Sequence, residues 1–168
     1  MFRRRKEQGE PSGDLPSTLR TSGGPAPAFR LKSSLGTEVS LSDYRGSPVI
    51  LVFYPADFSS VCGDQLALYN EVLPLFEEQG AKVVGISVDG LWCHKAFAEQ
   101  RNLRFPLLSD FEPKGTVAQA YGAYAAEKGL CHRALFVIDA QGIIQWSHLS
   151  PSGVNPGADG ILKSLASL

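Results

Sequence analysis

The chain has 168 residues, of which 43% are hydrophobic and 20% charged, and its formal net charge is −1. This balance is typical of one soluble globular domain and excludes a disordered or fibrous chain. A nearly neutral chain has no electrostatic reason to bind nucleic acid or an anionic membrane surface. No run of about 18 apolar residues occurs, so we expect no membrane-spanning helix.

The first 24 residues differ in composition from the rest of the chain. They are rich in Gly, Pro, Ser and charged residues, and they begin with the basic run MFRRRK. Such a segment buries too little apolar surface to offset its ordering entropy. We therefore predict a disordered extension over residues 1–24 and a folded domain over residues 25–168. Polar residues follow the basic run, which argues against a secretory signal.

A buried strand followed by a helix is predicted near the start of the domain. Residues 49–54 form a continuous β-branched and aromatic run, typical of a strand covered on both faces. After it, apolar residues recur at spacings of three and four, which predicts a helix. Ser59 or Ser60 can cap this helix, Gly80 can end it, and Pro74 should kink it.

The remaining elements continue the alternation of strands and helices. We predict strands over residues 81–88 and 105–108, helices over 91–102 and 116–121, a hairpin of strands over 134–139 and 143–146, and a final helix over 159–168. This order predicts an α/β domain with a thioredoxin-like fold, in which helices cover both faces of a central mixed β-sheet.

Cys62 stands out because it falls in the first turn of a predicted helix, directly after a buried strand. Free backbone N–H groups and the positive end of the helix dipole stabilise a thiolate there, and the thiolate is the nucleophilic form. The alternative is an inert cysteine packed under the helix. Three cysteines in a chain of this size favour thiol chemistry in a reducing compartment, so we expect a cytoplasmic location.

Three neighbours favour the reactive interpretation of Cys62. Pro55 ends the strand, has no backbone N–H and can shield a thiolate from water. The Ser59 hydroxyl can donate to a bound oxygen or to the sulfur, although helix capping alone would also explain it. Arg133 begins a predicted strand and supplies a fixed positive charge, unless it is an ordinary surface charge.

Four segments together resemble the peroxiredoxin family, the AhpC/TSA-type thiol peroxidases with a thioredoxin-like fold. The first is FYPADFSSVC at residues 53–62, which resembles the motif of a proline, a Thr or Ser, and the peroxidatic cysteine. The others are LSDYRG at 41–46, GISVD at 85–89 and the arginine-bearing GLCHRALFVID at 129–139. The resemblance covers about residues 25–168.

The resemblance implies a thiol-dependent peroxidase that reduces hydrogen peroxide and organic hydroperoxides in antioxidant defence. Cys62 would become a sulfenic acid, with Pro55, Ser59 and Arg133 around the peroxide. The implied partners are a peroxide and a thiol reductant of thioredoxin, glutaredoxin or low-molecular-weight type, and a homodimer is compatible with the family. No metal, haem or flavin is implied. The alternative is a peroxide sensor or relay that passes oxidation from Cys62 to a partner protein.

The chain departs from the family at two places. The family usually has a glutamate three residues after the peroxidatic cysteine, where this chain has Gln65. A second cysteine five residues on would fall at Ala67, and the tail after Ser150 has none. Reduction of the sulfenic acid therefore falls to an external thiol, to Cys93 or to Cys131, in that order of preference.

Two other interpretations of the cysteines have weaker support. A thioredoxin-like disulfide reductase needs Cys-x-x-Cys at the helix start, and residues 62–65 carry one cysteine. The pairs Cys93-His94 and Cys131-His132 suggest zinc, but adjacent residues seldom point at one ion and the usual ligand spacing is missing. We therefore predict no metal site.

Overall fold

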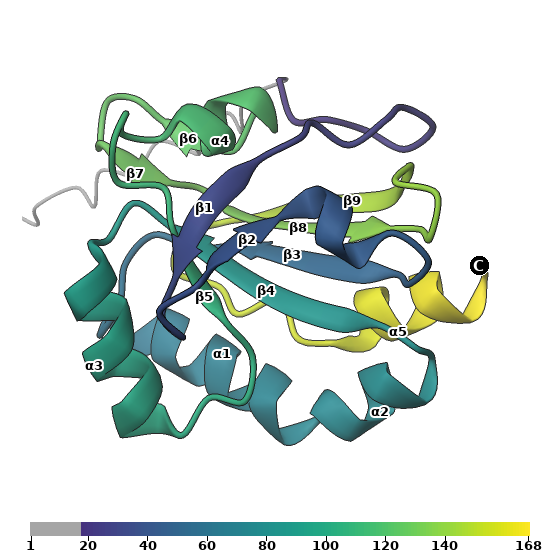
Figure 1. Cartoon of the computed structure of the whole chain (residues 1–168), viewed down its shortest axis with the longest axis horizontal. Coiled ribbons are helices and arrows are strands. Elements are labelled where there is room, and N and C mark those ends of the chain that lie inside the picture. Colours follow the sequence, from purple (N-terminus) through teal and green to yellow (C-terminus); the bar gives the residue numbers. More distant parts are fainter. Residues whose placement is uncertain (1–17) are drawn as a thin grey trace, which may run out of the picture.

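The computed structural model describes residues 18–168 (Figure 1). Seven strands form one mixed sheet in the order β2-β1-β5-β4-β3-β8-β9. Strands β3, β4 and β5 are parallel, and β8 is antiparallel to β3. The strands of the sheet are β1 (Arg30–Ser33), β2 (Glu38–Ser40), β3 (Val49–Phe53), β4 (Lys82–Ser87), β5 (Leu107–Ser109), β8 (Arg133–Ile138) and β9 (Ile144–Ser150). Strands β6 (Tyr124–Ala125) and β7 (Leu130–Cys131) pair separately.

Helices cover both faces of the sheet, as predicted. Helices α1, α2, α3 and α5 lie along one face, while the short α4 lies on the other with β6 and β7 (Figure 1). Their bounds are α1 (Ser60–Glu71), α2 (Leu73–Glu78), α3 (Leu91–Arg101), α4 (Thr116–Ala120) and α5 (Asp159–Ala166), and a 3-10 helix, η1 (Leu41–Tyr44), follows β2. The prediction of an α/β thioredoxin-like fold is confirmed. Within residues 18–168, none of the helices has the length and apolar character that a membrane span requires.

The predicted kink at Pro74 is a break between two helices. Helix α1 ends at Glu71 and α2 begins at Leu73, with Val72 between them. Pro74 lies in the first turn of α2, where its missing N–H removes no helical hydrogen bond. The break allows both helices to pack on the same face of the sheet, in place of one long straight helix.

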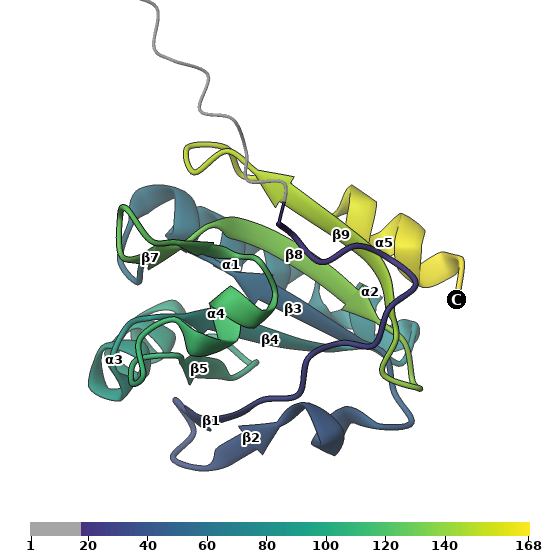
Figure 2. The same cartoon turned by 90° about the horizontal axis from the view of Figure 1, so that it is seen from above.

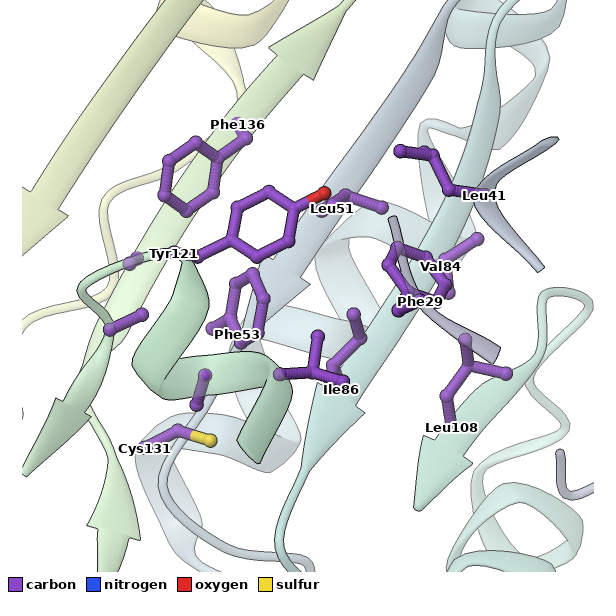
Figure 3. Close-up of a cluster of buried hydrophobic side chains, with 14 of the residues drawn as sticks. Phe29, Leu41, Leu51, Phe53, Val84, Ile86, Leu108, Tyr121, Cys131 and Phe136 are labelled. Atoms are coloured by element: carbon purple, nitrogen blue, oxygen red, sulfur yellow. The ribbon is translucent and has the colours of Figure 1, made fainter. Parts of the chain in front are cut away.

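Hydrophobic side chains fill both faces of β3, which explains its unbroken apolar sequence. Leu51 and Phe53 belong to the core on the α4 side, whereas Ile50 and Val52 belong to the core under α1, α2 and α5. In Figure 3 the rings of Phe53, Tyr121 and Phe136 meet in the first of these cores, and Cys131 lies among the same cluster. Because both cores are closed, β3 and β4 are a rigid base for the segments that follow them.

The sequence pattern does not predict the hairpin of β1 and β2. Both strands are short and carry charged residues, and their apolar side chains are only half-buried, as at Leu31 and Val39. Without a continuous apolar run, the sequence pattern of an edge hairpin resembles that of a loop.

The predicted boundary between extension and domain is placed too late. The Arg20 N–H donates to the Tyr121 carbonyl at 3.0 Å, and the Gly23 N–H donates to the Ile144 carbonyl at 2.8 Å. Leu19 packs against the core on the same side. Figure 2 shows this segment running across the α4 face of the sheet. Residues 18–24 are therefore part of the domain, because backbone pairing compensates for their few apolar groups; residues 1–17 lie outside the described residues.

Gly122→Ala should weaken the docking of this segment. Gly122 has φ 71°, and a Cβ there would collide with the backbone of Thr18. Gly36→Ala is the matched control, since Gly36 has φ 81° and open space around its Cβ position. Both variants incur the cost of a left-handed backbone, about 1 kcal/mol. We expect Gly122→Ala to lower the free energy of urea unfolding by at least 1 kcal/mol more than the control. Equal losses would contradict the docking.

Candidate active site

The loop between β3 and α1 delivers Cys62 to the first turn of α1. Ser59 is the N-cap residue of that helix, and its Oγ accepts a hydrogen bond from the Cys62 N–H at 3.3 Å. The capping bond uses an oxygen lone pair and leaves the Ser59 hydroxyl hydrogen free to donate. Helix capping and donation to a bound oxygen are therefore compatible in this residue.

Arg133 reaches Cys62 from the neighbouring strand β8. Its Nη1 lies 3.4 Å from the Cys62 Sγ and donates to the Gln65 Oε1 at 2.7 Å. Its Nε and Nη2 both donate to the Ser152 carbonyl, at 3.2 and 2.6 Å. The guanidinium fork is thus held by the Ser152 carbonyl through Nε and Nη2, while Nη1 faces both the Gln65 amide oxygen and the Cys62 sulfur.

Burial makes the charge of Arg133 significant. The residue is only 2% exposed and the Cys62 side chain has no exposed surface. Within residues 18–168 no carboxylate forms an ion pair with Arg133, and its oxygen partners are a carbonyl and an amide. A buried charge is costly unless an opposite charge compensates it. The Cys62 sulfur is the group at hydrogen-bond distance of Arg133 that can become an anion.

Gln65 extends the site into a chain of hydrogen bonds. Its Nε2 donates to the Tyr69 hydroxyl at 3.1 Å, and that hydroxyl donates to the Gly157 carbonyl at 2.9 Å. The amide therefore accepts from Arg133 and donates to Tyr69, which a carboxylate could not do. This explains how Gln65 works at a position where the family usually has glutamate: the neutral side chain orients Arg133 without competing with Cys62 for its charge.

The other predicted residues lie at different places around this centre. Pro55 is half-buried in the loop that leads from β3 to Ser59. Cys93 is half-buried on α3, beside Asp57 of the same loop. Cys131 is buried in the core on the α4 face, and burial raises the pKa of its thiol, which leaves it protonated. All three cysteines are free thiols.

The two Cys-His pairs do not converge on one site. The ring of His94 bonds Asp57 and the Leu108 carbonyl, whereas Cys131 lies in the core on the α4 face of the sheet. His94 and Cys131 therefore have separate surroundings.

The sequence pattern does not predict a second set of polar residues beside the loop. Tyr54, Asp57 and His94 form a buried hydrogen-bonded group at the base of the loop. Phe58, the residue after Asp57, has a left-handed backbone with φ 63°. Its half-exposed ring packs against that of Phe97 on α3 in a tilted arrangement, with ring centroids 5.1 Å apart and an interplanar angle of 57°. The spacing of residues along the chain predicts neither the buried polar group nor the conformation of Phe58. Asp57 and His94, for example, are 37 residues apart.

The known proteins that resemble this chain in sequence and in fold carry the names of peroxide-reducing enzymes. The chain is 39% identical over 132 residues to alkyl hydroperoxide reductase E of Mycobacterium tuberculosis, which covers 78% of this chain and 86% of that protein. It is 38% identical over 149 residues to chloroplastic peroxiredoxin Q of Sedum lineare, covering 88% and 79%.

Solved structures agree with these sequence relatives. Peroxidoxin BcpB of Mycobacterium tuberculosis superposes with a TM-score of 0.79 at 32% identity, over 88% of this chain and 97% of that one. AhpC of Enterococcus faecalis gives a TM-score of 0.82 at 28% identity, over 89% and 92%. Fold and site thus define a thiol-dependent peroxidase of the oxidoreductase class. The AhpC/TSA family matches residues 22–147, and the chain belongs to this family as a peroxiredoxin.

Gln65→Glu should weaken the interaction between the Arg133 guanidinium and the Cys62 sulfur. A carboxylate at this position would pair with the guanidinium and oppose a second negative charge a few ångströms away. We expect iodoacetamide to alkylate Cys62 at pH 7 about threefold to tenfold more slowly, measured by mass spectrometry of the tryptic peptide. Gln119→Glu makes the same chemical change at an exposed position of α4 and should leave the rate unchanged. Alkylation at the original rate in Gln65→Glu would contradict this role.

Proposed function

We propose that Cys62 is the peroxidatic nucleophile of this peroxiredoxin, with Ser59, Pro55 and Arg133 as its supporting residues. The observation that carries the proposal is the buried guanidinium of Arg133, whose neutral oxygen partners leave the Cys62 thiolate to compensate its charge. The reaction is thiol-dependent reduction of peroxides, an antioxidant activity in accord with the family. The substrates we propose are hydrogen peroxide and organic hydroperoxides.

The first step transfers one oxygen atom to sulfur. The Cys62 thiolate attacks one peroxide oxygen, a sulfur–oxygen bond forms, and the oxygen–oxygen bond breaks. The departing oxygen takes a proton and leaves as water or alcohol, and Cys62 becomes a sulfenic acid. Arg133 and the free hydrogen of Ser59 are placed to stabilise the charge that develops on the oxygens, and Pro55 offers no competing N–H.

The second step consumes thiols. One thiolate attacks the sulfenic sulfur, so that a disulfide forms and water leaves, and a second thiol then releases reduced Cys62. We propose an external reductant of thioredoxin, glutaredoxin or low-molecular-weight type, with Cys93 as the intramolecular alternative. Cys131 is a poor candidate because it lies buried in the opposite core. The relatives named as reductases and peroxidases favour turnover over the sensor alternative.

The setting of the reaction follows from the same features. Three free cysteines suit a reducing compartment, and we propose the cytoplasm. We also propose a homodimer, in line with the AhpC structures that the chain resembles. Analytical ultracentrifugation of the reduced protein tests the dimer directly.

Cys62→Ser should abolish peroxide consumption while the fold persists. The hydroxyl of serine is a far weaker nucleophile than a thiolate, and the substitution keeps the size of the side chain. The measurement is peroxide loss with an added thiol reductant, alongside the circular dichroism spectrum. Cys131→Ala is the matched control and should retain activity. Peroxide turnover near the original rate in Cys62→Ser would overturn the assignment.

Arg133→Ala should slow the peroxide step by about a hundredfold, because it removes both the compensating charge and a preorganised donor. Stopped-flow mixing of reduced protein with hydrogen peroxide gives the rate constant. Arg30→Ala, which removes an exposed arginine paired with Glu38, is the control and should change nothing. A loss smaller than about threefold in Arg133→Ala would remove Arg133 from the mechanism.

A further inference from the structure

The hydrogen bonds of Arg133 lead in two directions to the same loop, residues 151–158 between β9 and α5. In one direction, its Nε and Nη2 donate to the Ser152 carbonyl at 3.2 and 2.6 Å. In the other direction, its Nη1 is followed by the Gln65 amide, the Tyr69 hydroxyl and the Gly157 carbonyl. One loop therefore holds both ends of this hydrogen-bonded chain.

The Gln65 amide has two possible orientations, and one of them serves Arg133. A guanidinium donates and never accepts, so Gln65 binds it with the oxygen Oε1 and turns Nε2 away from it. In the reversed orientation two donors would face each other, and Arg133 would lose a buried acceptor. Arg133 by itself favours the first orientation, and the neighbour on the far side of the amide decides how strongly.

Tyr69 is that neighbour, and its own hydrogen points elsewhere. Burial raises the pKa of Tyr69 to about 12, so the hydroxyl keeps its hydrogen near neutral pH. This hydrogen is donated to the Gly157 carbonyl, which only accepts, at an oxygen–oxygen distance of 2.9 Å. The Tyr69 oxygen therefore presents a lone pair to Gln65 and accepts from Nε2 at 3.1 Å. A reversed amide would place its oxygen against this lone pair.

Burial makes the contribution of Tyr69 hard to replace. Gln65 and Tyr69 have no exposed surface, and the ring of Tyr69 packs edge-on against Phe76 in the core under α1, α2 and α5. Bulk water does not reach these groups. Removal of the Tyr69 oxygen would leave the Gln65 amide hydrogens without this acceptor, and the amide would lose part of its preference for the orientation that Arg133 needs.

We infer that Tyr69 is a positioning residue for the peroxide step, because its hydroxyl orients the Gln65 amide that in turn holds Arg133. The inference rests on the proposed function and adds to it a residue that acts through Gln65. It also explains the pairing of the two residues on α1, since side chains four residues apart share one face of a helix. A carboxylate in place of the amide would need no such partner, because both of its oxygens accept.

Tyr69→Phe tests the inference, because it removes the hydroxyl and keeps the ring that packs in the core. We expect the rate constant for oxidation of the reduced protein by hydrogen peroxide, measured by stopped-flow mixing, to fall about threefold to tenfold. The matched control is Tyr121→Phe, which removes a hydroxyl that donates to the Pro27 carbonyl at 2.7 Å in the core on the α4 face. Each variant loses a tyrosine-to-carbonyl hydrogen bond, and Tyr121→Phe should be oxidised at the original rate. Equal rate constants in the two variants would overturn the inference.

A double-mutant cycle separates positioning from a general effect on the fold. Gln65→Met keeps the length of the side chain and removes the amide, so that the Tyr69 hydroxyl has nothing left to orient. In the Gln65→Met background we therefore expect Tyr69→Phe to change the peroxide rate constant by less than about 1.5-fold. A further loss as large as in the original background would overturn the inference, because Tyr69 would then act by another route.

The orientation of the amide can also be observed in the unmodified protein. We expect a nuclear Overhauser effect between the side-chain amide hydrogens of Gln65 and the ring hydrogens of Tyr69 beside its hydroxyl. Absence of this effect, with both sets of resonances assigned, would overturn the inference whether or not Tyr69→Phe folds. Failure of the proposed function has a different signature, since peroxide would then leave Cys62 of the unmodified protein unoxidised in peptide mapping by mass spectrometry.

Discussion

The buried charge of Arg133 is the constraint on which the site depends. A guanidinium inside a protein needs several acceptors and an opposite charge, and this one takes its acceptors from α1 and from the segment after β9. Its backbone position is fixed by β8, which pairs with β3 on one side and with the edge strand β9 on the other. Strand β3 of the same sheet leads into the loop that carries Cys62. Scaffold and chemistry are therefore linked through one side chain.

The regular elements could be predicted from sequence because their side chains repeat the burial pattern. The continuous run at residues 49–54 and the helical spacing after Cys62 both arise from contacts that each strand or helix makes along its whole length. The edge hairpin and the segment at residues 18–24 could not be predicted in this way. Backbone hydrogen bonds hold β1 to the distant strand β5 and residues 18–24 to Tyr121 and Ile144, and such bonds leave no mark on side-chain composition.

The candidate site shows the same division. Pro55, Ser59, Cys62 and Arg133 could be singled out because three lie within eight residues and the fourth begins a recognisable strand. Ser152, Tyr69 and His94 could not, since each takes its part through a contact across the fold. Gln65 stands out in the sequence as a departure from the family, but its role follows only from the geometry of its amide between Arg133 and Tyr69.

The backbone of Phe58 has a further consequence for how the enzyme opens. A left-handed conformation costs a residue with a Cβ about 1–2 kcal/mol, and Phe58 adopts it between the anchored Asp57 and the capping residue Ser59. Its ring on Phe97 supplies part of the compensation. Because Cys62 has no exposed surface, a bulky thiol can reach its sulfur only after the surrounding segment moves. A movement that returned Phe58 to an ordinary backbone conformation would release this cost and would lose the contact with Phe97.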